Sequence, residues 1–558
     1  MWIGLVAVLV VLVLVPLISV QAKALLDGGQ AYRDMLDSPW LGATMFNTVL
    51  LGVGSVLVAL VCGTFLAGCA WQLPKRLAWL SVLPIVPLSV PGLALVTSWS
   101  FLLSPQTGYI NQFLRKAPWW DHLASGPIDV YSRFWIIFIT GTLLIPFVYL
   151  FILTALRGID GALIEAAEAN GARSVRVWAK VILPLLRPSL VYSSSIVLLL
   201  GLGQFTAPLL LGRDQNVTVL TTEMYQAAQS YPVDYGLAAA YGSPLVLIGA
   251  LLIYVQRRAL KHSSRYETLS SRGHRSSSKT RSWPAIPILV YIVVALILPL
   301  FGLLNVALAD YYSGAVITAD TATLANFSTV FNDPDLGRAV GNSVGYSLVA
   351  VLIVVPLGFM IAVALSGSSR IPPRLRTTVD LLTSVPLVMP GVLFGAGILF
   401  TYSSGPIVLY GTGAALILAY ITIMIPHVAK MQSSAMLSAG SSLQDSARVH
   451  GASALRTHAR ITVPLLRPAI AASVALCLSI LTHEFGASVM VRSTSTEVMG
   501  TLLLRYWSQG AYPSVAVVAL TMCAITGALV ALSYAFTGSR RHEKKKPKSS
   551  VTNAILKG

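Results

Sequence analysis

The residues of this chain that could do chemistry begin with two ionisable side chains inside an apolar stretch. His483 and Glu484 lie within the apolar residues 469–491, and a charge at the middle of a bilayer costs about 2.5 to 3.5 kcal/mol. Side chains kept at such a cost are candidates for lining a transport pathway. A shift of 280 positions places Glu484 on Gln204, so we expect these residues at an interface between two halves. A hydrogen bond between helices is the alternative explanation.

Other kinds of chemistry are missing from the sequence. It contains no G-x-x-x-x-G-K-[ST] phosphate-binding loop, which nucleotide hydrolysis of that class requires. Ferric iron prefers clustered oxygen ligands, and no carboxylates or tyrosines are spaced to assemble them. The cysteines lie in apolar segments without metal-ligand spacing, which favours packing as small hydrophobes: Cys62, Cys69, Cys477 and Cys523. We therefore predict no enzyme activity, catalytic residue, metal site or cofactor within this chain.

A polar stretch, EAAEANGARSVRVWAKVILPLLRP over residues 165–188, recurs as DSARVHGASALRTHARITVPLLRP over residues 445–468. In the first copy, helix-forming residues precede Gly171, which permits a positive φ or a close approach of the backbone. Pro184 and Pro188 then stop or kink the chain before the next apolar segment. The pattern predicts a short exposed helix, a break at the glycine, a second helix and a return to the membrane.

The short helix has the features of a docking element. Ala166 and Ala167 give it a narrow face that could enter a groove on a partner, and Glu165 supplies a charge that could fix the register. The alternative is an amphipathic loop that packs on its own helical bundle. The recurrence of the glycine and the distal prolines at equal spacing favours docking.

The elements that must position these residues are membrane-spanning helices. Only 11% of the 558 residues are charged and the mean hydropathy is +0.74, whereas soluble proteins carry about 25% charged residues. A helix needs roughly 20 apolar residues to cross a bilayer. Twelve segments qualify, near 3–20, 46–71, 79–103, 134–156, 190–211, 237–256, 285–307, 342–366, 380–402, 411–429, 469–491 and 512–536. The first could instead be a cleaved signal peptide, although no cationic region precedes it.

The distribution of charge predicts which helix ends face the cytoplasm. A net charge of +18 would suit a nucleic-acid-binding protein, but most of the Lys and Arg residues fall in the loops after every second segment. That asymmetry is typical of cytoplasmic loops. It predicts a multi-pass protein with both termini in the cytoplasm, no nucleic-acid partner, and a basic tail that meets anionic lipid or stays solvated.

The twelve segments form two halves that are related by an internal sequence repeat. A shift of 299 positions lays PLSVPG, residues 87–92, on PLVMPG, residues 386–391. Prolines in these stretches are expected to kink helices, for gating or for packing: Pro87, Pro91, Pro386 and Pro390. Parallel repeats are related by an axis along the membrane normal, which favours a central pathway. The predicted organisation is a first domain over 1–256, a Ser-rich basic linker over 257–284, a second domain over 285–538 and a basic tail over 539–558.

At the recurrent polar stretch the chain resembles the permeases of bacterial binding-protein-dependent ABC importers. The signature of that family is EAA, three residues, Gly, about nine residues and I-x-L-P. The first copy matches it at Glu165, Ala166, Ala167, Gly171 and Leu183-Pro184. The second copy is degenerate but keeps the glycine, with Asp445, Ser446, Ala447 and Gly451 at the equivalent positions.

The resemblance implies an all-α integral membrane protein of two fused six-helix permease domains in the bacterial plasma (inner) membrane. It implies that the loops 157–188 and 430–468 couple to two copies of a separate ATPase subunit, which would bind ATP and Mg. The degenerate second loop leaves room for unequal docking. An extracytoplasmic binding protein would deliver the cargo. Polar residues near the outer mouth are either contacts for that protein or solvated loop residues: Glu223, Tyr225, Glu497 and Arg505.

The fused form resembles most closely the ferric-iron importers and their relatives for thiamine, phosphonates and polyamines. The stretches SPQTGYIN, GQFTAPLLLG and VLTTEMY, at 104–111, 203–212 and 219–225, support the iron-like branch, so ferric iron is the expected cargo and the others are alternatives. A rival of another class is a secondary transporter driven by an ion gradient, in which His483 and Glu484 couple protons. The paired cytoplasmic loops argue against it.

Overall fold

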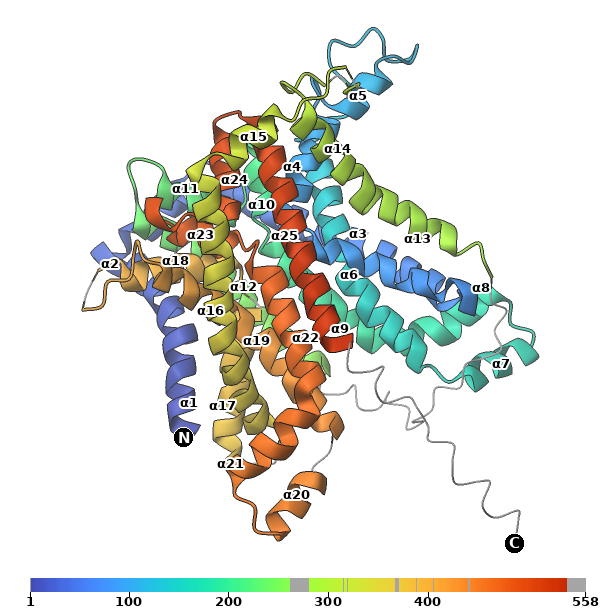
Figure 1. Cartoon of the computed structure of the whole chain (residues 1–558), viewed down its shortest axis with the longest axis vertical. Helices are drawn as coiled ribbons and strands as arrows, with labels where there is room; N and C mark the ends of the chain where they lie inside the picture. Colours follow the sequence, from blue (N-terminus) through green and yellow to red (C-terminus); the bar gives the residue numbers. More distant parts are fainter. Residues whose placement is uncertain are drawn as a thin grey trace.

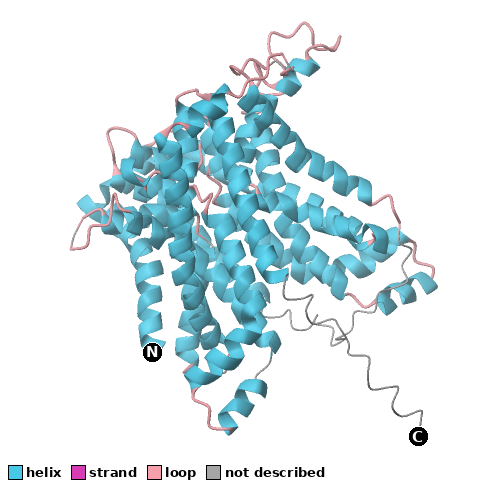
Figure 2. Ribbon diagram, in the orientation of Figure 1, coloured by secondary structure: helices cyan, strands magenta, loops and turns pink. Residues whose placement is uncertain are grey.

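The computed structural model describes residues 2–260, 281–314, 316–318, 320–366, 371–387, 389–404, 406–439 and 442–538. Within these ranges every regular element is a helix, and β-type pairing is limited to an isolated bridge between Ala309 and Ala322 (Figure 2). The predicted all-α class is therefore confirmed. Most of the predicted linker 257–284 and all of the predicted tail 539–558 lie outside the described residues.

The first repeat begins with a long apolar helix and ends with the helix that leads into the linker. Its elements are α1 (Trp2–Leu9), η1 (Val10–Leu14), α2 (Val15–Asp37), α3 (Leu41–Trp71), η2 (Lys75–Ser89), α4 (Gly92–Leu103), α5 (Tyr109–Leu114), α6 (Arg133–Gly158), α7 (Gly161–Ala169), α8 (Ser174–Val177), η3 (Trp178–Ile182), α9 (Leu183–Leu202), α10 (Thr206–Leu211), η4 (Arg213–Gln215), α11 (Leu220–Gln229) and α12 (Tyr235–Leu260).

The second repeat follows a similar order of elements, except that α15 is added before its long second span and no helix corresponds to α5. Its elements are α13 (Ala285–Ile292), η6 (Val293–Ile297), α14 (Leu298–Leu308), α15 (Ala325–Phe331), α16 (Pro334–Leu365), α17 (Pro373–Ser384), η7 (Val385–Leu387), α18 (Gly391–Tyr402), α19 (Gly413–Ala439), α20 (Ser442–Val449), α21 (Ala454–Thr457), η8 (His458–Thr462), α22 (Val463–Leu481), α23 (Gly486–Val491), η9 (Thr494–Thr496), α24 (Met499–Ser508) and α25 (Tyr512–Gly538).

Two of the twelve predicted spans are not straight helices. Among the described residues, ten helices are long and apolar enough to cross a membrane. The segments predicted near 79–103 and 380–402 are instead helix pairs bent by 91° and 108°. Each bend falls at a proline, Pro91 or Pro390, which stands just before the second helix of its pair. Proline has no N–H to continue the preceding helix, so apolar composition alone cannot reveal the change of direction.

The prolines after the polar stretches behave differently from our prediction. Pro184 and Pro188 were expected to stop or kink the chain, but the helix continues from α8 through η3 into α9. The continuation passes through a π-helical turn, whose wider ring of hydrogen bonds precedes Pro184 by two residues. The second repeat has the same arrangement, so the span predicted near 469–491 runs over Ala454–Leu481 instead.

The combination of a π-helical turn and a following proline occurs twice in each repeat. The described residues include four π-helical turns, η1, η3, η6 and η8. In each case a proline stands two residues after the turn ends: Pro16, Pro184, Pro299 and Pro464. A proline cannot donate to the helix ladder, so each turn accommodates a position at which one hydrogen bond is missing.

The first span of each repeat packs against the other repeat. In Figure 1 the blue helix α2 lies beside α18, and the green helices α13 and α14 lie beside α3 and α4. Hydrogen bonds cross between the repeats at these contacts: Thr401 Oγ1 donates to Ser19 Oγ over 2.8 Å, and Thr422 Oγ1 donates to the Leu12 carbonyl over 3.2 Å. The repeats that are separate in sequence therefore interlock in space.

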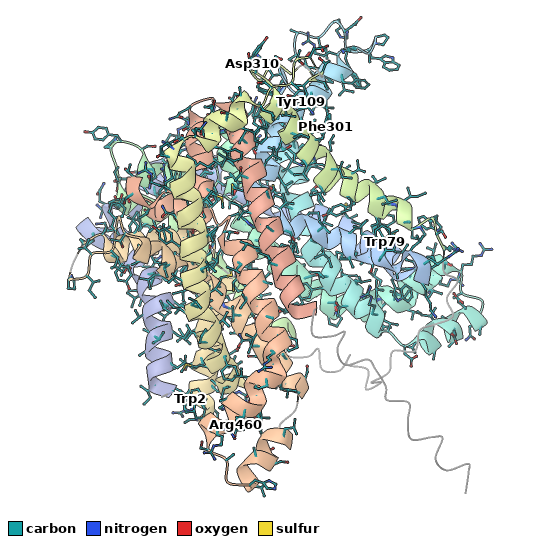
Figure 3. The ribbon with its side chains drawn as sticks, in the orientation of Figure 1. Trp2, Trp79, Tyr109, Phe301, Asp310 and Arg460 are labelled. Atoms are coloured by element: carbon teal, nitrogen blue, oxygen red, sulfur yellow. The ribbon has the colours of Figure 1, made fainter. Side chains whose placement is uncertain are left out.

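The two ends of the helical bundle differ. The short helices α7 and α20 lie toward the lower part of Figure 1, and Figure 3 shows Trp2 and Arg460 in the same part of the view as α20. Helices α5 and α15 and the residue Asp310 lie at the opposite end (Figures 1 and 3). Large apolar side chains such as Trp79 remain exposed on the flanks of the bundle, as expected where a helix meets lipid.

Candidate coupling loops and translocation pathway

The first polar loop forms the short exposed helix that its sequence predicts. Asp160 caps α7 by accepting a hydrogen bond from the backbone N–H of Ala162 over 3.0 Å. At the other end Gly171 has a φ of +79° and its N–H donates to the Glu168 carbonyl over 2.9 Å. The N–H of Ala172 donates to the Ala167 carbonyl over 3.1 Å. This is the glycine-ended helix terminus in which the left-handed residue satisfies the last carbonyls.

The second loop ends in the same way although its sequence is degenerate. Gly451 has a φ of +77°, and the N–H of Ala452 donates to the Ala447 carbonyl over 3.0 Å. A Cβ built on Gly171 or Gly451 would meet nothing within 4 Å in the described chain. The positive φ, rather than a close approach, is therefore what requires glycine at both positions.

The faces of the two short helices differ in what they bury. Glu165 and Ala166 are exposed, Ala167 is half-buried, and Ile164 is buried at 4% exposure as an apolar anchor. In α20 the residues at the same positions as the first three, Asp445, Ser446 and Ala447, have the same burial classes. The anchor position is held by Gln444, which is also buried.

An exposed apolar residue follows each glycine. Val175 is 81% exposed and Leu455, its equivalent under the 280 shift, is 80% exposed. The next equivalent pair, Val177 and Thr457, is buried in both repeats. The two loops therefore have the same pattern of burial, with one exposed apolar side chain at the equivalent position.

The two repeats meet at a pair of aromatic rings that the sequence analysis did not single out. Phe205 and Phe485 stack with ring centroids 5.5 Å apart and an interplanar angle of 27°. They are equivalents under the 280 shift, and a residue that contacts its own equivalent lies on the axis that relates the repeats. Both rings are 5% exposed, so the contact closes this part of the axis. The signal was available in the sequence, because each phenylalanine directly follows a predicted pathway residue.

Gln204 lies beside this contact, at the break between α9 and α10. Its Oε1 accepts a hydrogen bond from Thr140 Oγ1 over 2.8 Å, and its backbone carbonyl accepts from Thr221 Oγ1 over 2.6 Å. The Nε2 has no hydrogen-bond partner among the described residues. A Cβ on the neighbouring Gly203 would come within 2.8 Å of Pro390 Cγ, so the break of one repeat touches the bend of the other.

Glu484 holds the start of a short helix in the second repeat. Its carboxylate accepts hydrogen bonds from the backbone N–H groups of Ala487 (2.8 Å) and Ser488 (3.0 Å) and from Ser488 Oγ (2.7 Å). Ser488 Oγ also shares a hydrogen bond with the Tyr420 hydroxyl over 2.9 Å. A carboxylate is favourable at a helix N-terminus. These bonds satisfy the buried acid locally.

His483 does not join Glu484. Its Nδ1 lies 3.5 Å from Thr526 Oγ1 on α25, and no hydrogen bond links the two neighbouring side chains among the described residues. Of the three predicted pathway residues, Glu484 and Gln204 directly precede the two stacked phenylalanines. The roles of all three in transport remain predictions.

The predicted outer-mouth residues separate into two groups. The Tyr225 ring packs edge-on against Phe205 with centroids 5.5 Å apart. Glu497 and Arg505 instead form an ion pair with a separation of 3.0 Å, and Arg505 also reaches Asp335 over 2.7 Å. Asp335 was missed because its stretch, NDPD, is typical of an ordinary helix start.

Within the described part of the chain, no three His, Cys, Asp or Glu residues are grouped so that they could hold a metal ion. What the arrangement provides is two bent spans, two broken spans and a closed aromatic contact on the axis between repeats.

Comparison with known proteins gives matches over both repeats. A model of the family described as binding-protein-dependent transport system inner membrane component matches residues 55–263 and 354–540. The ferric transport system permease protein FbpB of Actinobacillus pleuropneumoniae is 23% identical over 504 residues, covering 86% of this chain and 69% of that protein. The probable ABC transporter permease protein y4fN of Sinorhizobium fredii is 24% identical over 490 residues, 84% of each chain. A putative ferric transport system permease protein of Haemophilus influenzae is 23% identical, covering 82% of this chain and 72% of that protein.

Proposed function

The chain belongs to the family of binding-protein-dependent transport system inner membrane components, and from that premise we propose that its two repeats form the translocation pathway of an ATP-driven importer. The observation that carries the proposal is the pair of short helices α7 and α20. Both project from the helical bundle and end in the same glycine geometry, although their sequences differ.

Each short helix docks on one copy of a separate ATPase subunit, which binds ATP and Mg. The exposed residues Glu165 and Ala166, together with Val175 and its equivalent Leu455, form the contact surfaces. The end of the bundle that carries α7 and α20 then faces the cytoplasm of a bacterium, and the chain lies in its inner membrane with both termini inside.

The pathway runs along the axis between the repeats. Phe205 and Phe485 close it in the conformation described here, with Gln204 and Glu484 as the polar side chains on either side of the contact. Movement of the ATPase subunits is transmitted to this aromatic contact through the bends at Pro91 and Pro390. Separation of the rings opens the pathway, because an apolar constriction excludes water and polar cargo while it is narrow.

Ferric iron is the proposed cargo. Support comes from the relatives, two of which carry names that refer to ferric transport and align with most of this chain. An extracytoplasmic binding protein delivers the iron, so the permease needs no high-affinity site. Thiamine, a phosphonate or a polyamine is the alternative cargo for the same role.

The test is reconstitution with partners. The chain is co-purified with the ATPase encoded beside it, placed in liposomes, and ATP hydrolysis is followed with and without a neighbouring binding protein loaded with ferric iron. We expect the loaded protein to stimulate hydrolysis and iron to accumulate inside. If a binding protein loaded with a different cargo stimulates hydrolysis, that cargo replaces iron in the proposal and the role as an importer stands.

The rival secondary transporter predicts another outcome. No ATPase would co-purify, uptake would follow a proton gradient, and Glu484→Gln would abolish it. The importer predicts uptake without a proton gradient. The separation of His483 from Glu484 by their different hydrogen-bond partners favours the importer.

A further inference from the structure

A cavity of about 500 Å³ lies between the end of α16, helix α17 and helix α19. It opens in the second repeat, in the part of the bundle that also carries α20 and α21 (Figure 1). The side chains that decide its chemistry are Arg376 and Asp380 on α17 and Lys430 and Ser433 on α19. Leu365 and Leu437 form its apolar wall.

The first repeat has a large aromatic side chain near the equivalent place. Tyr149 is fully buried there, and its hydroxyl donates a hydrogen bond to the Ser81 carbonyl over 2.6 Å. The 280 shift that relates α6 to α19 replaces Tyr149 with Ala429, which removes the ring. The same shift replaces Leu150 and Leu153 with Lys430 and Ser433. The second repeat therefore has a lysine and a serine where the first has two leucines, and it lacks the buried tyrosine ring.

The charged side chains of the lining, Arg376, Asp380 and Lys430, carry a net positive charge. Lys430 Nζ pairs with Asp380 Oδ1 over 2.8 Å, so these two charges offset each other. Arg376 donates to the Leu365 carbonyl, and a guanidinium has five N–H donors, so donors remain for an anion. The Asp380 carboxylate is the one acid among the lining residues.

Ser433 is the observation that points to a ligand. Its side chain is only 8% exposed, it lines the cavity, and its Oγ has no hydrogen-bond partner among the described residues. A buried hydroxyl without a hydrogen-bond partner destabilises the fold, because it has lost its hydrogen bonds to water. A bound acceptor in the cavity would remove that cost.

We propose that this cavity binds the phosphate group of an anionic phospholipid headgroup. A phosphate accepts hydrogen bonds from Arg376 and Ser433 at once, and guanidinium groups match its geometry. Leu365 ends a membrane-spanning helix, and Leu437 is 63% exposed at the rim, so the apolar wall can follow the glycerol and acyl part of the lipid. Basic pockets between spanning helices on the cytoplasmic side are typical lipid headgroup sites.

The experiment measures which lipid the full chain retains. The purified chain is equilibrated with equal amounts of phosphatidylglycerol and phosphatidylcholine, and retained lipid is counted by native mass spectrometry. We compare wild type with Arg376→Gln and with Ser433→Leu, which carries the residue of the first repeat. The control is Arg374→Gln, which removes a cation on the same helix outside the cavity.

We expect preferential retention of phosphatidylglycerol by wild type and by the control, and about tenfold weaker retention by Arg376→Gln, since one charge-assisted hydrogen bond is lost. Ser433→Leu should lose retention by filling the cavity. A thermal unfolding midpoint is measured for each variant to show that it is folded. If Ser433→Leu is unfolded, the comparison of wild type with Arg376→Gln still tests the proposal.

Two results would overturn the proposal. Equal retention by wild type and Arg376→Gln would place the lipid elsewhere on the chain. Binding of millimolar inorganic phosphate with the same dependence on Arg376, together with no retained phosphatidylglycerol, would make the ligand a free phosphate and not a lipid. Neither result bears on the importer, because the assay contains no ATPase, binding protein or cargo.

Discussion

Single residues decide the shape of the loops that are proposed to meet the ATPase. Gly171 and Gly451 both adopt a positive φ with open space around them. A residue with a side chain in that conformation costs about 1 to 3 kcal/mol. The sequence alone identified both glycines, because their spacing from the distal prolines is the same in the two repeats.

Gly171→Val tests that geometry. We expect the variant to lose most of its ATP hydrolysis stimulated by the binding protein, because the strain moves the end of α7 away from its docking position. Hydrolysis is measured in liposomes with the ATPase and the loaded binding protein. Gly42→Val is the matched control, since Gly42 also has nothing within 4 Å but an ordinary φ. Full stimulation of ATP hydrolysis in Gly171→Val would show that the loop conformation at Gly171 is not needed for coupling.

The aromatic contact between the repeats gives a second prediction at this scale. Replacing both Phe205 and Phe485 with alanine removes the rings that close the axis. We expect liposomes containing this variant, without any ATPase, to release a small trapped solute faster than wild-type liposomes. Replacing Phe327 and Phe331, a ring pair on α15, should leave release unchanged. If the double variant releases the solute no faster than wild type and still transports, the rings are not the barrier.

Glu223 adds a prediction about pH. Burial raises the pKa of this carboxyl above its ordinary value, although a hydrogen bond from Thr218 opposes the shift. The folded state therefore favours the protonated acid, and this contribution to stability is lost as the pH rises through the raised pKa. Glu223→Gln should raise the unfolding temperature at pH 7 and have less effect near pH 4. A gain that is equal at both values would show that charge is not the cause.

At the scale of elements, the apolar segments were predictable and their directions were not. Twelve stretches long enough to cross a bilayer could be read from composition, and ten of them appear as spanning helices in the described residues. The bends before Gly92 and Gly391 depend on which carbonyls a proline leaves unpaired and on what packs there. Those contacts come from distant segments, such as Pro390 against Gly203, and no local pattern reports them.

Close packing between elements gives a prediction of its own. A Cβ on Gly397 of α18 would come within 2.7 Å of the Pro16 carbonyl oxygen on α2. Gly397→Val should therefore destabilise the fold by about 1 to 3 kcal/mol, seen as a lower unfolding temperature in detergent. Gly341→Val on α16 carries the same helix cost without a contact within 4 Å. Equal losses in the two variants would assign the effect to helix propensity.

At the scale of the whole molecule, the exchange of first spans could not be read from the sequence. The repeat predicts two equal halves, but nothing in the order of segments indicates that α2 packs on α18 and α14 on α4. Such contacts join residues hundreds of positions apart, as in the hydrogen bond between Thr401 and Ser19. These contacts bury apolar surface that each repeat alone would leave uncovered.

The exchange predicts that the two repeats hold together without their covalent connection. Residues 1–265 and 281–558, co-expressed as separate chains with an affinity tag on one, should co-purify in equal amounts. The reason is that each chain supplies a helix to the bundle of the other. Residues 38–265, which lack α1, η1 and α2, should capture much less of the second chain. Recovery of the tagged chain alone would mean that the linker is needed for association.

The π-helical turns also carry information about the ancestry of the chain. A π-helical turn arises when one residue is inserted into an α-helix, and such turns are rare. Here η1 and η6 occupy equivalent positions in the two repeats, as do η3 and η8, and all four precede a proline by the same interval. Four independent insertions at matching sites are far less economical than two. The most economical account is that a half-length ancestor already had both turns before its gene was duplicated and the copies were fused.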